Sequence, residues 1–302
     1  MPTLKNYLSL IRFSHTIFAM PFAGIGFAMG WRQYDLAQRN PSVGGVPPLD
    51  VTAWLIKLML VLCCMVFART AAMAFNRYLD RHFDARNPRT AIREIPSGII
   101  AADQVLWFTA INALLFLGCS YFINSLCFLL APVALLVILG YSYTKRFTAL
   151  CHLVLGLGLS LAPLGAYLAI TARFSLLPVL VSLAVIGWVS GFDIIYALQD
   201  EAFDREQKLH SIPALLGKKK ALSVSRLLHG GSVLAVTAIG YWGAFGWLYW
   251  IGALVFTGML IYQQSIVSPD DLRKVNLAFM TANGIASVVF AAFVVTDILF
   301  FH

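Results

Sequence analysis

Two clusters of carboxylates interrupt an otherwise apolar chain of 302 residues. The first reads Asn76-Arg-Tyr-Leu-Asp80-Arg-His-Phe-Asp84, and the second begins at Asp193 and ends in Asp200-Glu-Ala-Phe-Asp204. Each cluster ends in Asp-x-x-x-Asp, a spacing that places two carboxylates one turn apart on one face of a helix. Such a pair repels itself unless a cation lies between its members. The spacing therefore indicates divalent metal, and Mg²⁺ held jointly by carboxylates and substrate phosphates is the usual form of this arrangement.

Basic residues must complete such a site, because carboxylates alone would repel a diphosphate. Mg²⁺ inverts the local sign of the charge. The candidates are Arg69, which lies seven residues before Asn76, the pair Lys145-Arg146, and Arg12. Basic residues are also expected at cytoplasmic helix ends without any further function. That explanation fits Arg69 least, because Arg69 lies inside an apolar run.

The composition places the chain in a membrane. Hydrophobic residues make up 60% of it and charged residues only 12%, whereas a soluble domain carries about 25% charged residues. Hydrophobic stretches of about 20 residues recur along the whole length, as membrane-spanning helices require. No alternating barrel pattern is present, so we predict an all-α, polytopic membrane protein that forms a single domain over residues 1–302.

The hydrophobic runs predict nine transmembrane helices in one bundle. Two longer polar stretches, 76–101 and 193–220, are expected to be loops that carry the acidic clusters. The spans are expected at about 10–31, 53–75, 102–120, 122–141, 150–171, 174–192, 221–240, 243–264 and 275–300.

The basic residues predict the orientation of the bundle. With nine spans, 18 of the 22 lysines and arginines fall on the side that holds the N-terminus and the two acidic clusters. That side should be cytoplasmic. The start of the chain shows neither a cleavable signal peptide nor an Arg/Ser-rich leader, so we expect a multi-pass protein of a prokaryotic inner membrane, with the active site facing the cytoplasm.

The two acidic clusters resemble each other beyond their carboxylates. Each follows an even-numbered span, four spans apart, and each is followed by an arginine and later by an Ile-Pro pair. We interpret this as an internal duplication, and duplicated bundles often carry their site between the two halves. On one continuous helix, Asp193, Asp200 and Asp204 would lie within roughly 40° of one another. We expect both clusters to face one negative pocket.

Other classes of function fit less well. A nucleic-acid partner is not expected, because no soluble domain presents the basic residues. A cation-coupled transporter usually places its site near the bilayer midplane. Here the acids lie at one face, and the sequence shows no partner for Asp297 near the other end of its span. The five cysteines lie in apolar stretches without a CxxC pattern and are expected to pack as small hydrophobic residues.

The acidic motifs resemble the two signature motifs of the UbiA family of membrane prenyltransferases. The segment Tyr141-Ser-Tyr-Thr-Lys145-Arg146-Phe-Thr is similar to a third element of that family, and Ile11-Arg12-Phe13-Ser-His-Thr-Ile-Phe resembles its 4-hydroxybenzoate polyprenyltransferase branch. The resemblance covers nearly the whole chain. It implies Mg²⁺-dependent transfer of a polyprenyl group from polyprenyl diphosphate to an aromatic acceptor in quinone biosynthesis.

The resemblance also implies roles for individual residues. The metal and its diphosphate are expected to be bound by Asn76, Asp80, Asp84, Asp200 and Asp204. The phosphates are expected to contact Arg69, Lys145 and Arg146, with Tyr141 at the head of the prenyl chain and with Arg12 and Tyr196 as further substrate-binding candidates. Asp80 and Asp200 are expected to take part in catalysis as ligands of the metal. Asp193 is the hypothesised group that orients the phenol or accepts its proton.

The acceptor is left open between two aromatic hydroxy acids. The branch resemblance favours 4-hydroxybenzoate. The segment Lys208-Leu-His210-Ser211-Ile212-Pro213 also suits UbiA-like enzymes of an alternative menaquinone route, whose acceptor would be a dihydroxynaphthoate. Both acceptors are aromatic carboxylates that bear a hydroxyl group. The prenyl tail is expected to lie among the helices, open to the bilayer, because a long isoprenoid gains most from apolar burial.

Overall fold

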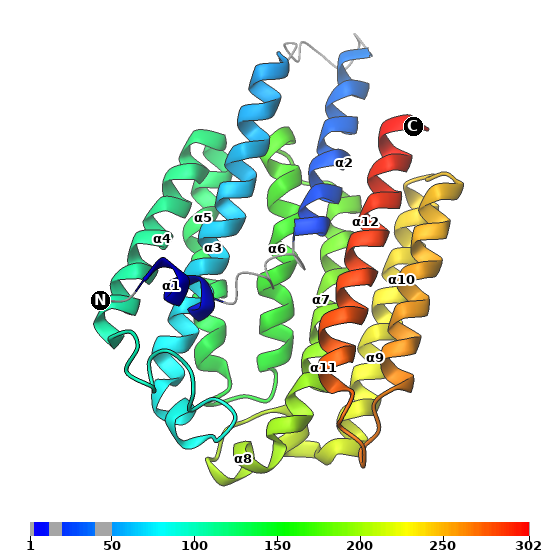
Figure 1. Cartoon of the computed structure of the whole chain (residues 1–302). Coiled ribbons are helices and arrows are strands. Elements are labelled where there is room, and N and C mark those ends of the chain that lie inside the picture. Colours follow the sequence, from blue (N-terminus) through cyan, green and yellow to red (C-terminus); the bar gives the residue numbers. More distant parts are fainter. Residues whose placement is uncertain (1–2, 12–19, 40–49, 302) are drawn as a thin grey trace.

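The computed structural model of the protein describes residues 3–11, 20–39 and 50–301. These residues form a helical bundle without strands (Figure 1). The helices are α1 (Leu4–Leu10), α2 (Met20–Arg39), α3 (Val51–Arg86), α4 (Ala102–Ile123), α5 (Ser125–Thr144), α6 (Cys151–Thr171), α7 (Leu176–Ala197), η3 (Leu198–Asp200), α8 (Glu201–Glu206), α9 (Ile212–Trp242), α10 (Trp247–Ser265), α11 (Val275–Leu277), η4 (Ala278–Ala282) and α12 (Asn283–Phe300).

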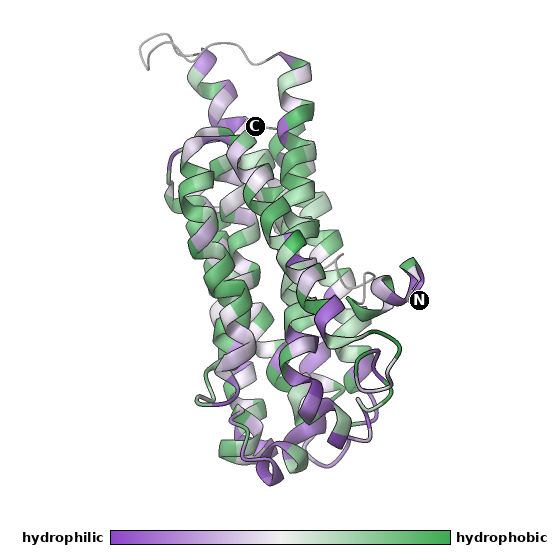
Figure 2. Cartoon of the chain, turned by 90° about the vertical axis from the view of Figure 1, so that its left-hand side faces the viewer, coloured by the Kyte–Doolittle hydropathy of each residue, from purple (hydrophilic) through white to green (hydrophobic). Residues whose placement is uncertain are grey.

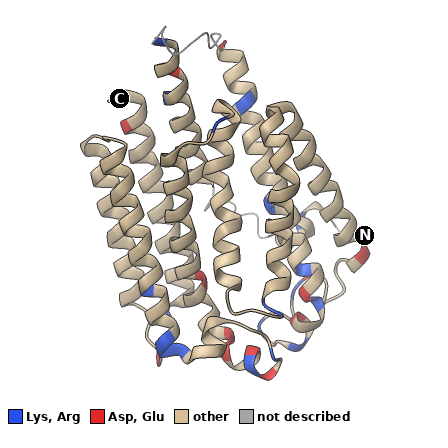
Figure 3. Cartoon of the chain, turned by 180° about the vertical axis from the view of Figure 1, so that it is seen from behind, with Lys and Arg blue, Asp and Glu red and all other residues tan. Residues whose placement is uncertain are grey.

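The helices confirm the predicted all-α membrane class, whereas the count of nine spans stays a prediction. Within the described residues, seven segments are long and apolar enough to cross a membrane. They comprise α3, α4, α5, α6, α9, the continuous stretch from α7 through α8, and the stretch from α11 through α12. Two further helices, α2 and α10, are not among the seven. Figure 2 shows hydrophobic residues along the bundle and hydrophilic residues gathered at one end, and Figure 3 shows acidic and basic residues together at that end, which we call the charged end.

Several helices extend beyond their predicted spans. The first span was expected to end at residue 31, but α2 continues to Arg39. The second was expected to end at residue 75, but α3 continues to Arg86, so the first acidic cluster is helical and the loop starts only after it. The seventh was expected to begin at residue 221, whereas α9 has a first helical segment that begins at Ile212 and is separated by the non-helical Gly217 from the helix that enters the apolar run. The spans followed the apolar runs, whereas the backbone hydrogen bonds continue into polar sequence.

The start of α9 has a clear local cause. Ser211 is its N-cap, and the Ser211 hydroxyl accepts a hydrogen bond from the Ala214 N–H at 3.2 Å. Proline follows within the first turn, where its missing N–H costs nothing. Gly217 then takes a positive φ of 77°, which kinks the helix before it enters the apolar run.

The core of the bundle surrounds α7. Trp188 of α7 is fully buried and lies against Phe22 of α2 and Phe256 of α10, with ring centroids 5.0 and 6.1 Å away. Phe290 of α12 completes this aromatic cluster. The site residues that α7 carries are therefore held by packing on several sides.

The opposite end of the bundle holds the one acidic residue for which the sequence showed no partner. The Asp297 carboxylate is fully buried and accepts hydrogen bonds from the backbone N–H groups of Gly246 at 2.9 Å and Tyr249 at 3.4 Å. It thus satisfies N–H groups at the start of α10, where a negative charge is also favoured by the helix dipole. Asp297 therefore links α12 to the start of α10.

Small residues let the helices approach closely. A Cβ atom placed on Gly26 of α2 would lie 2.0 Å from the Pro163 carbonyl oxygen of α6, whereas one placed on Gly24 would meet nothing within 4 Å. Helix interfaces in membranes use small residues in this way.

We expect Gly26→Ala to lower the stability of the protein by about 1–3 kcal/mol, because the added methyl group forces α2 away from α6. Gly24→Ala is the matched control on the same helix, and it should leave stability unchanged or raise it by up to about 1 kcal/mol through helix propensity. Thermal unfolding of the purified protein in detergent, followed by circular dichroism, measures both. Equal melting temperatures for the two variants would contradict the close α2–α6 contact.

Candidate active site

A cavity of about 240 Å³ lies at the charged end and brings the two acidic clusters together. Of the residues predicted from the sequence, ten line this cavity: Asn76, Asp80, Asp84, Tyr141, Lys145, Arg146, Asp193, Tyr196, Asp200 and Asp204. Arg69 lies elsewhere, as described below. Arg12 falls outside the described residues, so its role in binding substrate stays a prediction from the sequence.

The first cluster projects from the last turns of α3. Asn76, Asp80 and Asp84 follow one another at intervals of four on this continuous helix, which keeps them on one face. The Asn76 side-chain amide donates to the Asp80 carboxylate at 3.0 Å. The predicted face is therefore present, and it points into the cavity.

The second cluster does not share one helix, contrary to the prediction. Asp193 belongs to α7, Asp200 ends the 3₁₀ turn η3, and Asp204 belongs to the short helix α8. The 3₁₀ turn winds more tightly than an α-helix, so the angular estimate for a continuous helix does not apply. All three carboxylates line the cavity nevertheless.

Four carboxylates of the cavity form ion pairs with basic side chains. Asp84 lies 2.6 Å from Arg93, Asp80 lies 3.6 Å from Arg146, and Asp204 lies 2.7 Å from Lys145. Asp200 receives two hydrogen bonds from Arg89, which also donates to the Tyr196 hydroxyl at 3.0 Å. Each pair joins residues from different segments, so the pairs fix the two clusters relative to each other.

The segment 87–101 supplies site residues that the sequence prediction missed. Arg89 and Arg93 were counted only as basic residues of a cytoplasmic loop, and Asn87, which donates to Asp200 at 3.4 Å, was not considered. The segment lies at the same end of the bundle as α8 (Figure 1). Arg93 follows Asp84 by nine residues, and this proximity in the sequence was the available signal.

The ion pairs also set the charge of the basic groups. Burial would lower the pKa of Lys145, but the adjacent Asp204 carboxylate outweighs it, so that the pKa of Lys145 is raised. The same balance applies to Arg89, where burial opposes the charge and Asp200 raises the pKa. Both groups therefore stay cationic at neutral pH and can bind an anion.

The oxygen donors of the cavity suit a hard divalent cation. Asp84 Oδ2 is buried and has no hydrogen-bond partner among the described residues. No group of three or more His, Cys, Asp or Glu side chains in the described ranges is close enough to cage an ion alone. Mg²⁺ commonly takes one or two carboxylates and completes its coordination with water and substrate phosphates. The residues present fit an ion that arrives with a diphosphate.

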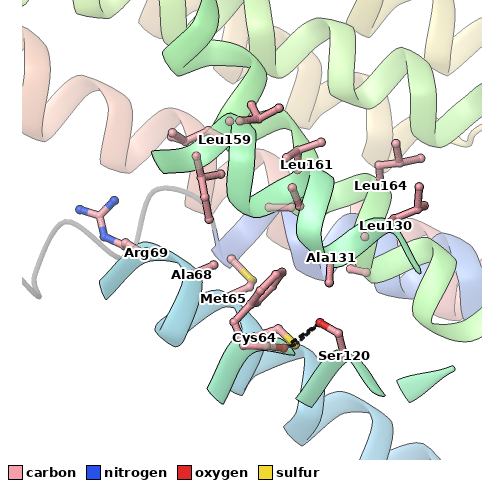
Figure 4. A pocket seen from close by; sticks show the side chains of 18 of the residues that line it. Cys64, Met65, Ala68, Arg69, Ser120, Leu130, Ala131, Leu159, Leu161 and Leu164 are labelled. Atoms are coloured by element: carbon pink, nitrogen blue, oxygen red, sulfur yellow. Dashed lines mark hydrogen bonds between the residues drawn. The ribbon is translucent and has the colours of Figure 1, made fainter. Parts of the chain in front are cut away.

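A second, apolar cavity of about 390 Å³ adjoins the first. Tyr141 and Leu155 line both cavities, and the apolar one continues between α3, α5 and α6. Arg69 lines this second cavity. Figure 4 shows Arg69 on the helix that bears Cys64, Met65 and Ala68, with the Arg69 guanidinium group apart from the apolar side chains.

The structure does not place Arg69 among the residues that line the acidic cavity. Seven residues on an α-helix rise about 10 Å, so Arg69 shares a face with Asn76 but lies deeper in the bundle. Its contact with the diphosphate stays a prediction.

Comparison with known proteins gives the same family from sequence and from structure. Residues 42–285 match the UbiA prenyltransferase family. The chain is 31% identical to a 4-hydroxybenzoate octaprenyltransferase of Aeromonas salmonicida (strain A449), over 85% of this chain and 87% of that protein. It is 28% identical to the protein of the same name from Tolumonas auensis, over 86% of this chain and 95% of that protein.

Solved structures share the fold. The apo structure of a UbiA homologue from Aeropyrum pernix K1 superposes with a TM-score of 0.81 at 29% identity, covering 95% of this chain and 98% of that one. A UbiA homologue from Archaeoglobus fulgidus, solved with DMAPP and Mg²⁺, superposes with a TM-score of 0.74 at 19% identity, covering 97% of this chain and 99% of that one. The chain described here belongs to the UbiA prenyltransferase family.

Proposed function

We propose that this prenyltransferase moves a polyprenyl group from polyprenyl diphosphate to the ring of 4-hydroxybenzoate, with Mg²⁺ as its cofactor. The observation that carries the proposal is one cavity that combines both acidic clusters with cationic partners and adjoins an apolar cavity at Tyr141. The names of the bacterial relatives support 4-hydroxybenzoate as the acceptor. Such a step belongs to ubiquinone biosynthesis.

We assign different residues to the diphosphate end and to the prenyl end of the substrate. Asn76 and the four carboxylates Asp80, Asp84, Asp200 and Asp204, which line the cavity, would hold the metal-bound diphosphate. When bound, Mg²⁺ would offset the charge that grows on the leaving diphosphate. Lys145 and Arg146 line the same cavity and would donate hydrogen bonds to the phosphate oxygens.

The rest of the substrate lies in apolar surroundings. The prenyl chain occupies the cavity between α3, α5 and α6, where it is shielded from water. The Tyr141 ring stands at the junction, beside the first carbon of the chain, where an aromatic face stabilises developing positive charge. We assign the Tyr196 ring and Asp193 to the acceptor, and Arg12 to the anionic group of the acceptor or to the diphosphate.

The topology that accompanies this function is a bundle of nine transmembrane helices in which α2 and α10 also span the bilayer. The charged end faces the cytoplasm, since most basic residues lie there. On this assignment, the protein resides in a bacterial inner membrane and takes both substrates from the cytoplasmic side.

A product assay in purified membranes tests the reaction. Labelled geranyl diphosphate is offered with Mg²⁺ or with EDTA, and with 4-hydroxybenzoate or 1,4-dihydroxy-6-naphthoate as the acceptor. We expect a prenylated hydroxybenzoate that forms with Mg²⁺ and not with EDTA. Product from the naphthoate alone would assign the enzyme to menaquinone biosynthesis, for which the segment 208–213 is the supporting sequence feature. No product from either acceptor would contradict the proposed reaction.

Removal of one cavity carboxylate should abolish most of the turnover. We expect Asp80→Asn to lower kcat on the order of 100-fold, because it weakens metal binding where charge develops in the transition state. Glu206→Gln is the matched control, since Glu206 is an exposed acid of α8 that does not line the cavity. Initial rates at saturating Mg²⁺ measure both variants. Equal losses of activity would show that overall charge, and not the cavity, governs the rate.

A further inference from the structure

One carboxylate of the cavity has a partner unlike the others. Asp193 of α7 accepts a hydrogen bond from His152 Nδ1 of α6 at 2.7 Å. The imidazole is only 3% exposed, whereas the side chain of Asp193 is 24% exposed, and both residues line the cavity. The histidine therefore forms the buried half of the pair, and the carboxylate faces the space where substrate would bind.

The position of the His152 proton follows from its second contact. The backbone N–H of Ile212, at the start of α9, lies 3.3 Å from His152 Nε2. A backbone N–H can only donate, so this contact places Nε2 as an acceptor and Nδ1 as the donor to Asp193. The imidazole is thus held from both sides, by α7 and by the first residue of α9.

This partner differs from those of the other cavity acids. Among the described residues, Asp80, Asp84, Asp200 and Asp204 each lie against an arginine or lysine side chain, whereas Asp193 lies against the imidazole of His152. The contact with His152 fixes the direction of the Asp193 carboxylate and occupies its Oδ2 atom. Within the described residues the Oδ1 atom makes no hydrogen bond, so it can accept a proton.

The pair lies beside the junction of the two cavities. Leu155, which lines both of them, follows His152 by three residues and so lies on the same side of α6. Tyr196 follows Asp193 by three residues on α7 and also lines the acidic cavity. An acceptor ring at this junction would lie between the leaving diphosphate and the apolar cavity.

We propose that His152 is a positioning residue that aims Asp193 at the aromatic acceptor, with Asp193 as the base. This proposal rests on the function proposed above. In the reaction, a ring carbon bonds to the first carbon of the prenyl group while the bond from that carbon to the diphosphate oxygen breaks, with the electron pair on the leaving group. The proton of the attacked ring carbon then passes to the free Asp193 oxygen, and the aromatic ring is restored.

The test uses the full chain, purified into lipid nanodiscs, with kcat and KM measured for the acceptor and for geranyl diphosphate. His152→Leu removes both hydrogen bonds, whereas the amide of His152→Asn can replace the Nδ1 donor. We expect His152→Leu to lower kcat about 10–100-fold, the size seen when an orienting partner is lost, with KM for geranyl diphosphate unchanged. His152→Asn should recover part of that loss.

A double-variant comparison separates positioning from general damage. If His152 acts through Asp193, the double variant His152→Leu/Asp193→Asn should have nearly the same kcat as Asp193→Asn alone. Ser160→Ala is the control on the same helix, since Ser160 is buried but lines neither cavity, and it should keep wild-type kcat.

Two results would overturn the proposal. One is wild-type kcat in His152→Leu. The other is a loss of kcat in His152→Leu that His152→Asn does not relieve and that adds in full to the loss in Asp193→Asn, together with an equal rise in KM for both substrates. Both results require an active wild-type enzyme, so they differ from failure of the proposed function, in which the wild-type protein forms no product.

Discussion

The site depends on the pairing of carboxylates with basic groups inside an apolar bundle. Asp204 is fully buried, and its charge is balanced by Lys145 at 2.7 Å. It also accepts a hydrogen bond from the Ser211 hydroxyl at 2.9 Å. The His210 N–H in turn donates to the Lys145 carbonyl at 2.7 Å. Removing one member of a buried ion pair costs about 3–5 kcal/mol, so these contacts are hard to break. They join the end of α5, helix α8 and the start of α9 into one unit.

The same pairing explains why four of the five acids that line the cavity lie against an arginine or lysine. A magnesium diphosphate carries both signs of charge, and each sign requires complementary groups in the wall. Carboxylates that bind the cation would leave arginine and lysine side chains available to the phosphate oxygens. Asp193 stands apart because, among the described residues, its side-chain partner is the imidazole of His152 and not an arginine or lysine. The metal-binding acids and the proposed base thus differ in the side chains that lie next to them.

The sequence predicted what depends on local patterns and missed what depends on contacts between distant segments. Apolar runs predicted the helical membrane fold, and the Asp-x-x-x-Asp spacing predicted most of the carboxylates in the cavity. The 3₁₀ turn before α8 was missed because a periodic pattern does not reveal a change in winding. The pairs Arg89–Asp200 and His152–Asp193 join residues 111 and 41 positions apart, so no spacing rule could find them. Arg69 lines the adjoining apolar cavity, and its contact with the phosphates stays a prediction.

The most direct test of this account is to locate the divalent cation. Crystals grown with Mn²⁺ and a non-hydrolysable geranyl thiodiphosphate would show the ion by its anomalous scattering. We predict density in the cavity between α3 and α8, with carboxylate oxygens from both acidic clusters, or waters bound to them, in the coordination shell at about 2 Å. Density beside only one cluster, or elsewhere in the bundle, would contradict a site built by both.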